Sequence, residues 1–182
     1  DTFQSMIATS LKLRRVTAPL FVQSGMGIND DLNGVEQPVK FFASGIGVQC
    51  EIVHSLAKWK RMKLAEMNEQ AGYGIYTDMN AIRTDEELDE LHSLYVDQWD
   101  WEKVIEVKDR TTHILHHHVQ LIYQSLLNTE YIVCEHYPAI QPFLPKQISF
   151  VTAEQLLQDY PSLSAKEREN AIAREKGAVF VQ

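Results

Sequence analysis

Long apolar runs and an excess of basic residues are both missing from this sequence of 182 residues. No stretch of about 18 apolar residues indicates a membrane span, and no basic, apolar, small-residue segment opens the chain as in a signal peptide. The 17 Lys and Arg residues stand against 25 Asp and Glu residues, a formal net charge of -8. That balance argues against a surface that binds nucleic acid by neutralising phosphates. We therefore expect a cytoplasmic protein with neither nucleic acid nor membrane as a partner.

Cysteine is scarce, and the familiar short motifs of enzymes are absent. Cys50 and Cys134 are too few and too far apart for a disulfide framework or a zinc knuckle, so we expect two buried, reduced thiols. The sequence contains no Walker loop, GxGxxG, GxSxG or HExxH motif. Its two GxG pairs are interpreted as turns, because neither has a third glycine. Hydrophobic residues make up 45% of the chain and charged residues 23%, which predicts an ordered single domain over residues 1–182.

The spacing of apolar residues predicts a mixture of helices and strands. Capping-box patterns at Thr152 and Ser164 predict the starts of two short helices, and Gly177 predicts the end of the second. The longest helix is expected where neither Gly nor Pro occurs. The remaining expected elements are a helix over 3–11, a strand over 15–22 with Pro19 inside it, a hairpin over 39–53, a helix from Ser55, a strand pair over 75–82 and 91–99, and the long helix over 111–135.

Two clusters of ionisable side chains receive non-catalytic interpretations. Two imidazoles from His113, His116, His117 and His118 would share a face of the long helix. No carboxylate or thiol completes a ligand set there, so a surface or interface role is favoured over a metal site. The acidic run at 84–90 lacks the glycine turn of a calcium loop and is interpreted as a solvated loop.

Polar residues in the predicted strands are the strongest local signal of a binding site. On a strand, Gln98 and Asp100 share one face and the neighbouring tryptophans take the other. A buried carboxylate or amide is unfavourable unless a ligand or an ion partner satisfies it. With Arg83 at the end of the preceding strand, this pattern indicates a substrate floor. The alternative is a structural Asp–Arg pair beneath a tryptophan cluster.

Three long strings carry a resemblance to a known family. They are HSLAKWKR at 54–61, AIRTDE at 81–86 and LHSLYVDQWDWE at 91–102, supported by PFLP at 142–145, QISFV at 147–151 and GAVF at 177–180. Read together, they resemble the ammonia-dependent asparagine synthetases, the aspartate-ammonia ligases. The resemblance covers essentially the whole chain.

The resemblance implies an α+β fold, an antiparallel β-sheet flanked by helices, similar to the catalytic domain of class II aminoacyl-tRNA synthetases. It implies a cytoplasmic homodimer that converts L-aspartate, ammonia and ATP, with Mg²⁺, to asparagine, AMP and pyrophosphate through β-aspartyl-AMP. The first class II motif would be the strand over 15–22, packing against its copy in the dimer. A buried arginine suits this chemistry, because a guanidinium can hold a carboxylate and a phosphate as charge develops.

The resemblance also assigns roles to individual residues. Arg83 would contact the activated carboxylate and the α-phosphate, with Gln98 beside it. Asp100 would receive the α-ammonium of aspartate. The remaining assignments are Ser55 and Lys60 around the α-carboxylate and Asp30, in the loop at 27–36, near the reacting amide to orient ammonia or take a proton.

Two departures from the family pattern bear on these expectations. Val35 stands where some members have cysteine, so no thiol acts there. Family chains also continue past Gln182 with the adenine pocket and the third motif, so we expect a truncated chain that is inactive alone. The alternatives are a non-catalytic amino-acid-binding or regulatory module of the same fold, and an aspartyl- or asparaginyl-tRNA synthetase core.

Overall fold

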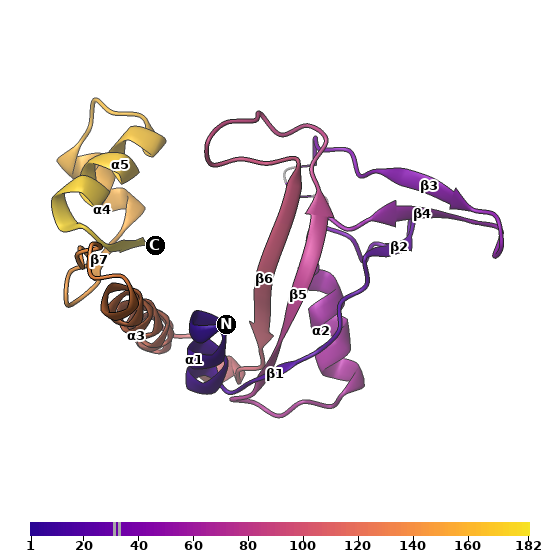
Figure 1. Cartoon of the computed structure of the whole chain (residues 1–182), viewed down its shortest axis with the longest axis horizontal. Coiled ribbons are helices and arrows are strands. Elements are labelled where there is room, and N and C mark those ends of the chain that lie inside the picture. The colour runs from indigo at the N-terminus through magenta and orange to yellow at the C-terminus, as the bar shows by residue number, and fades with distance from the viewer. Residues whose placement is uncertain (31, 33) are drawn as a thin grey trace. The chain divides into compact units, whose positions relative to one another are not determined.

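A computed structural model describes residues 1–30, 32 and 34–182 of the chain. The chain divides into two compact units, residues 1–10 with 107–182, and residues 11–106 (Figure 1). The two units are described separately, and the expected single domain stays a prediction. Among the described residues, no helix is both long enough and apolar enough to cross a membrane.

The unit of residues 11–106 is built on a three-stranded sheet with the order β1-β5-β6. Its strands are β1 (Leu13–Arg15), β5 (Gly74–Ile82) and β6 (Tyr95–Lys103). β1 runs parallel to β5, and β6 runs antiparallel to β5 over nine residue pairs. The expected strand pair is therefore confirmed, although β6 starts four residues later than expected and runs on to Lys103.

A second sheet of the same unit has the order β2-β4-β3 and is antiparallel throughout. Its strands are β2 (Phe21–Gln23), β3 (Lys40–Ala43) and β4 (Val48–Ile52). The predicted hairpin is confirmed as β3 and β4. Gly47 ends its turn with a φ of 69° that a side chain would disfavour.

The single long strand expected over residues 15–22 is wrong. The chain leaves β1 after Arg15 and enters β2 at Phe21, and these two strands belong to different sheets. Pro19 lies in the break between them. Because proline has no backbone N–H to donate to a ladder, this segment favours an irregular crossing over a continuous strand.

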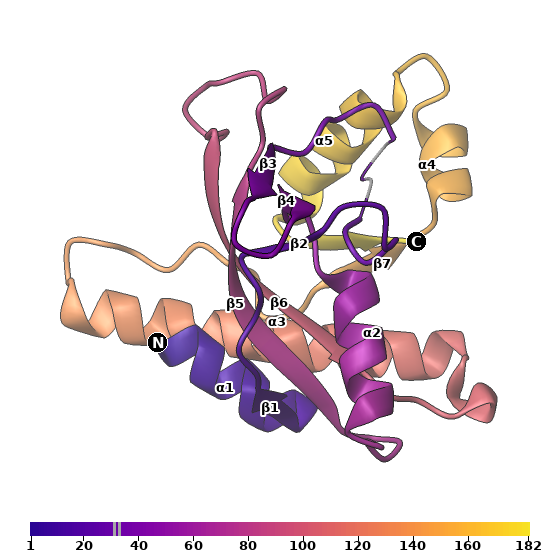
Figure 2. The same cartoon turned by 90° about the vertical axis from the view of Figure 1, so that its right-hand side faces the viewer.

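Helix α2 (Ala57–Glu66) lies against the β5–β6 sheet (Figures 1 and 2). The core beneath it joins Val53 and Leu56, from the segment before the helix, to Met79 and Ala81 of β5. The side chain of Ser55 does not cap α2, whose N-cap residue is Leu56. The predicted start of this helix at Ser55 is therefore one residue too early.

The face shared by Gln98 and Asp100 is confirmed by the register of the ladder. Gln98 lies opposite Met79, which is only 2% exposed, and Asp100 follows two residues later in the same strand. Directly opposed residues of an antiparallel pair share a face. Both polar side chains therefore lie on the buried face, whereas the ring of Trp99 packs against Tyr76 at 5.2 Å on the other face.

The unit of residues 1–10 and 107–182 is mostly helical, and its predicted capping residues are confirmed. Thr152 and Ser164 accept hydrogen bonds from the first turns of two helices, and Gly177 ends the second with a φ of 74°. Its elements are α1 (Thr2–Leu11, whose last residue belongs to the other unit), the 3₁₀ helix η1 (Val107–Asp109), α3 (Thr112–His136), β7 (Ser149–Val151), α4 (Ala153–Asp159), α5 (Ala165–Lys176) and β8 (Val179–Val181). The longest helix is α3, as predicted, and β7 pairs with β8 in parallel.

The histidines of α3 take part in packing and local hydrogen bonding. The His116 ring stacks on Phe150 at 3.9 Å, and its Nε2 lies 3.0 Å from Oε1 of Gln182. The Nδ1 atom of His118 lies 2.8 Å from a backbone carbonyl one turn earlier. Within the described part of the chain, no three His, Cys, Asp or Glu side chains gather to hold a metal. Both cysteines are free thiols, and Cys50 is buried as expected, but Cys134 is only half-buried because it lies in the largely exposed last turns of α3.

Candidate functional site

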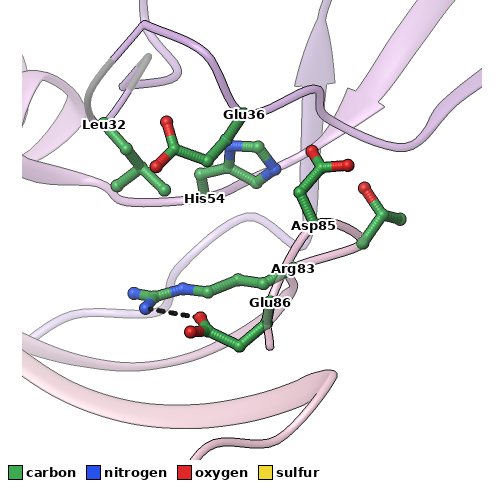
Figure 3. A pocket seen from close by; sticks show the side chains of 7 residues that line it. Leu32, Glu36, His54, Arg83, Asp85 and Glu86 are labelled. Atoms are coloured by element: carbon green, nitrogen blue, oxygen red, sulfur yellow. Dashed lines mark ion pairs between the residues drawn. The ribbon is translucent and has the colours of Figure 1, made fainter. Parts of the chain in front are cut away.

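A small cavity lies beside the residue that follows β5, within the unit of residues 11–106. Its volume is about 90 Å³. Three segments meet there: the loop before β3, the segment between β4 and α2, and the turn that follows β5 (Figure 3). The lining residues are Leu32, Glu36, His54, Arg83, Thr84, Asp85 and Glu86. The expected site residue Arg83 is therefore part of a cavity wall.

Arg83 has hydrogen-bonding capacity that the chain does not use. Its Nη1 atom lies 3.6 Å from Oε2 of Glu86, an ion pair too long for a good hydrogen bond. Its Nε atom is buried and has no partner among the described residues. A buried N–H without an acceptor is unfavourable, so such a group in a cavity wall indicates a ligand.

His54 is the second wall residue with an unpaired buried atom. The residue is only 1% exposed. Its backbone N–H donates to Oδ1 of Asn29 at 2.8 Å, which fixes the main chain at this point. Its Nε2 atom is buried without a partner among the described residues, and the ring lies between Glu36 and Asp85 in Figure 3.

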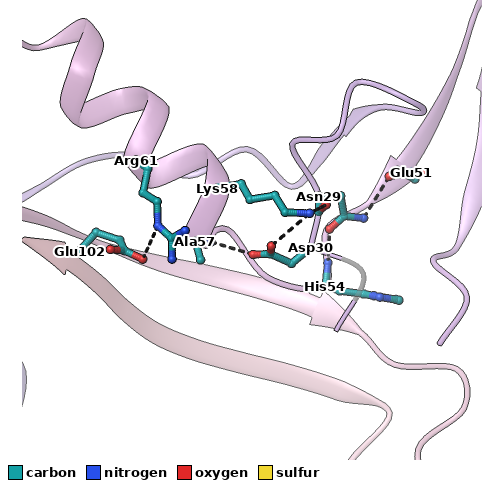
Figure 4. Close-up of polar contacts among 8 residues, drawn as sticks. All are labelled: Asn29, Asp30, Glu51, His54, Ala57, Lys58, Arg61 and Glu102. Carbon is teal, nitrogen blue, oxygen red and sulfur yellow. Dashed lines mark hydrogen bonds and ion pairs between the residues drawn. The ribbon is translucent and has the colours of Figure 1, made fainter. Parts of the chain in front are cut away.

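Asn29 and Asp30 clamp their loop to the start of α2 (Figure 4). Asn29 Nδ2 donates to Oε1 of Glu51 at 3.2 Å, and Asn29 is 5% exposed. Asp30 Oδ2 accepts from the backbone N–H of Ala57 at 3.1 Å, and its Oδ1 lies 3.5 Å from Nζ of Lys58. A carboxylate at a helix N-terminus satisfies a free N–H group and interacts favourably with the helix dipole. Asp30 therefore caps α2 from a distant loop.

Lys60 and Asp100, both expected at the site, form an ion pair with each other. Lys60 projects from α2 and its side chain is fully buried, whereas the Asp100 side chain is 33% exposed. Arg61 is the next residue of α2, and its Nε lies 3.5 Å from Oε1 of Glu102, also on β6. The alternative for Asp100 was a structural ion pair with an arginine. Asp100 does form an ion pair, but its partner is Lys60 of α2.

The turn after β5 is exposed as predicted, apart from the half-buried Glu86, and it is also anchored at its start. Asp85 Oδ2 accepts from the backbone N–H of Gln37 at 2.9 Å, and the Thr84 hydroxyl donates to the carbonyl of Gln37 at 3.1 Å. The rest of the run, from 87 to 90, is exposed as predicted. The two anchors position the acidic residues of the cavity, because they tie the turn to the loop before β3.

The structure brings the predicted residues into neighbouring groups rather than one cluster. Arg83 lines the cavity, Asp30 and Ser55 lie at the start of α2, and Lys60 pairs with Asp100. The backbone of Asp30 donates to the carbonyl of Ser55 at 3.4 Å. Residues 31 and 33 of the singled-out loop lie outside the described residues, and Val35 is exposed.

Sequence reasoning missed several residues of this region. They are Asn29, Glu36, His54 and Glu86. A signal existed for His54, since it is a polar residue between an apolar strand end and the start of a helix. The others had no such signal, because their positions depend on contacts between segments that are distant in sequence.

Comparison with known sequences decides the family. A sequence model of the family described as aspartate-ammonia ligase matches residues 1–182. The chain belongs to the aspartate-ammonia ligase family. It is 58% identical over 182 residues to the aspartate-ammonia ligase of Bacteroides thetaiotaomicron, covering 100% of this chain and 53% of that protein. It is 50% identical to the aspartate-ammonia ligase of Clostridium perfringens, covering 100% of this chain and 54% of that protein. The chain thus spans about half the length of the curated relatives it matches.

Solved structures agree with the fold expected of an aspartate-ammonia ligase. The asparaginyl-tRNA synthetase of Entamoeba histolytica, in complex with asparaginyl-adenylate, matches with a TM-score of 0.58 over 98% of this chain and 42% of its own. The two sequences are 12% identical, so this likeness establishes the fold alone. The α+β fold of a class II synthetase catalytic domain is confirmed.

Proposed function

We propose that the polypeptide carrying this chain ligates ammonia to the side-chain carboxylate of L-aspartate. A carboxylate oxygen attacks the α-phosphorus of ATP, the bond to pyrophosphate breaks, and β-aspartyl-AMP forms. Ammonia then attacks the acyl carbon, the bond to AMP breaks, and asparagine is released with loss of one proton. Family membership supports this proposal. The unpaired, buried Nε of Arg83 in a cavity wall is the observation that links this activity to a particular residue.

Arg83 is proposed to hold both reacting groups. A guanidinium presents a planar set of donors that matches a carboxylate or a phosphate, and it keeps its charge at any relevant pH. Negative charge builds on the α-phosphate as pyrophosphate departs. A donor already fixed in the cavity wall would stabilise that charge without having to reorganise. The ion pair with Glu86 supports this role by fixing the side chain from one end.

The Lys60–Asp100 pair is proposed to form the floor that receives the amino-acid end of aspartate. Lys60 orients one oxygen of the Asp100 carboxylate, and the partial exposure of Asp100 leaves it accessible to a substrate ammonium. Gln98, on the same face, would contact the substrate beside Arg83. Ser55 and Lys60 are proposed near the α-carboxylate. Asp30 is proposed to orient ammonia from the start of α2, a position that its hydrogen bond to Ala57 supports.

Magnesium is proposed only as part of the ATP substrate complex. Magnesium sites commonly use one or two protein carboxylates together with substrate phosphates. The described residues do not gather three metal-ligating side chains at any point, so they do not form a metal site on their own. No step is assigned to the ion.

The homodimer also remains a proposal. Its original basis, a long strand over 15–22, is wrong, but apolar side chains around β2 and β3 support an interface. Leu20 is 54% exposed and Phe21 45%, and the Phe21 ring packs at 5.1 Å against Phe41, which is itself 37% exposed. Exposed apolar residues clustered on a sheet are typical of a contact surface. Sedimentation that shows a monomer at micromolar concentration would refute the dimer.

The test compares Arg83→Lys with the natural polypeptide in aspartate-dependent exchange of pyrophosphate into ATP. The lysine keeps the charge and loses the bidentate geometry, so adenylate formation should lose about 2 to 4 kcal/mol of transition-state stabilisation. Aspartate binding without ATP, measured by calorimetry, should weaken less. Arg61→Lys is the matched control, because that side chain is 69% exposed and should tolerate the change.

The outcomes separate the three functions under consideration. Equal losses in exchange and binding would make Arg83 a ground-state aspartate ligand only. Absence of exchange in the natural polypeptide would favour a non-catalytic binding module. Aminoacylation of tRNA would favour a synthetase core, whereas AMP formation that requires both aspartate and ammonia supports the proposed ligase.

A further inference from the structure

The cavity beside Arg83 has the charge of a cation site rather than an anion site. Among the described residues that line it are three carboxylates, those of Glu36, Asp85 and Glu86, and one cationic side chain, that of Arg83. This net negative surround favours a small cation beside the carboxylates, whereas the substrate carboxylate and the α-phosphate are proposed at the guanidinium of Arg83. An anionic substrate would instead meet Arg83 at the cavity wall.

The size of the cavity restricts the cation further. A volume of about 90 Å³ has room for an ion of the size of a water molecule. Ammonium has nearly the size of water, and its four N–H groups need acceptors in several directions. Among the described residues, no three His, Cys, Asp or Glu side chains gather to hold a metal ion. Ammonium binds through hydrogen bonds, whose N···O distances are longer than metal–oxygen bonds.

His54 supplies the observation that is independent of the carboxylates. His54 lines this cavity and is only 1% exposed, and its Nε2 atom has no partner among the described residues. With the ring neutral and its proton on Nδ1, Nε2 is an acceptor that lacks a donor. Ammonium supplies that donor and carries the charge that the carboxylates favour.

We propose that this cavity binds the ammonium ion and that His54 removes one of its protons. This inference rests on the ligase activity proposed above. One N–H bond of ammonium breaks, its electron pair stays on nitrogen, and the proton moves to Nε2 of His54. The product is neutral ammonia beside Arg83, where the acyl group of the adenylate is proposed to lie. Asp30 is less suited to this proton transfer, because its two carboxylate oxygens already contact the N–H of Ala57 and the Nζ of Lys58.

The test separates binding of ammonium from adenylate formation in the natural polypeptide. His54→Gln should raise the KM for ammonium about tenfold to a hundredfold, the effect of losing one charged hydrogen bond. Aspartate-dependent pyrophosphate exchange, run without ammonia, should fall far less. Hydroxylamine is a largely uncharged nucleophile at neutral pH, so hydroxamate formation by the variant should also fall less than asparagine formation.

Three further variants make the result decisive. Glu36→Gln removes one carboxylate charge and should also raise the ammonium KM, and it serves as the test if His54→Gln does not fold. His136→Gln is the matched control. The His136 ring lies within hydrogen-bond distance of the carbonyl of Ile132 on α3, so this variant should not alter the kinetics. Asp30→Asn tests the competing assignment.

The kinetics of these variants decide whether His54 acts on ammonium. An unchanged ammonium KM in both His54→Gln and Glu36→Gln would overturn the proposal, as would a KM rise confined to Asp30→Asn. Equal losses of exchange and ammonium use in His54→Gln would make His54 a residue that only positions Arg83, and would also overturn it. Absence of exchange in the unsubstituted polypeptide would instead refute the ligase activity, so the two failures are distinguishable.

Discussion

Removal of Asp100 should test whether the ion pair beneath the site also stabilises the fold. Asp100→Ala would leave the Lys60 ammonium fully buried without its carboxylate partner. Removing one member of a buried ion pair typically destabilises a protein by about 3 to 5 kcal/mol. The partial exposure of Asp100 lets water approach from one side, so we expect the lower end of this range, about 3 kcal/mol.

Urea unfolding of the natural polypeptide, followed by circular dichroism, measures this free energy. For a cooperative unit of about 150 to 250 residues, a loss of about 3 kcal/mol corresponds to a fall in Tm of about 6 to 12 °C, and the fall is smaller for a larger unit. Glu102→Ala is the matched control, since it breaks the other ion pair between α2 and β6. Its partner Arg61 is 69% exposed, and exposed pairs typically contribute about 0 to 1 kcal/mol.

The double variant Lys60→Met with Asp100→Leu sharpens the argument. Replacing both charges with apolar groups removes the unpaired ammonium, so most of the stability lost in Asp100→Ala should return. Aspartate binding should not return, because the proposed contact to the substrate ammonium is gone. Equal stability of Asp100→Ala and the unsubstituted protein would refute this reasoning, since Lys60 would then have access to water or another partner.

Three other changes probe the elements that position the site. Asp30→Ala should destabilise α2 by about 1 kcal/mol through loss of the cap on the N–H of Ala57, and unchanged urea unfolding would contradict the capping role. Gly74→Ala should destabilise by about 1 to 3 kcal/mol or more, because a Cβ there would lie 2.3 Å from a carbonyl oxygen of β6, and an unchanged Tm would contradict the close approach. Hydrogen bonds from Ser164 lower the pKa of Glu167, so its carboxylate stabilises the fold above the ordinary glutamate pKa and this contribution disappears as pH falls through the lowered pKa. Glu167→Gln should therefore show a smaller loss of Tm on acidification, and an identical pH profile would contradict the sign.

The parts of the fold that depend on local sequence were predictable. The capping residues Thr152 and Ser164 and the terminating Gly177 lie where the sequence placed them, because each acts within one turn of its own helix. The alternation of polar residues and tryptophans on β6 was also visible, since a strand turns successive side chains to opposite faces.

The parts that depend on long-range contacts were not predictable from this sequence alone. Nothing local shows that Asp30 caps a helix 27 residues later, or that the partner of Asp100 is Lys60, 40 residues before it. The break of the expected strand before Phe21 likewise depends on which strand each half finds as a neighbour. In the site, residue types were predictable, and partners were not.

One short segment explains why these partners converge. The chain from β4 into α2 delivers His54 to the cavity and, six residues later, Lys60 to Asp100. Asn29 fixes the backbone of His54, and Asp30 fixes the first turn of the helix, so adjacent residues of one loop orient both ends of the segment. A shift of α2 along the sheet would therefore disturb the ion pair and the cap together, because both contacts constrain the same rigid helix. The cap and the ion pair use different side chains, so their coupling can be measured in a double variant. If α2 responds as a unit, the losses of unfolding free energy in Asp30→Ala and Asp100→Ala should be non-additive, and if each contact acts only locally they should add.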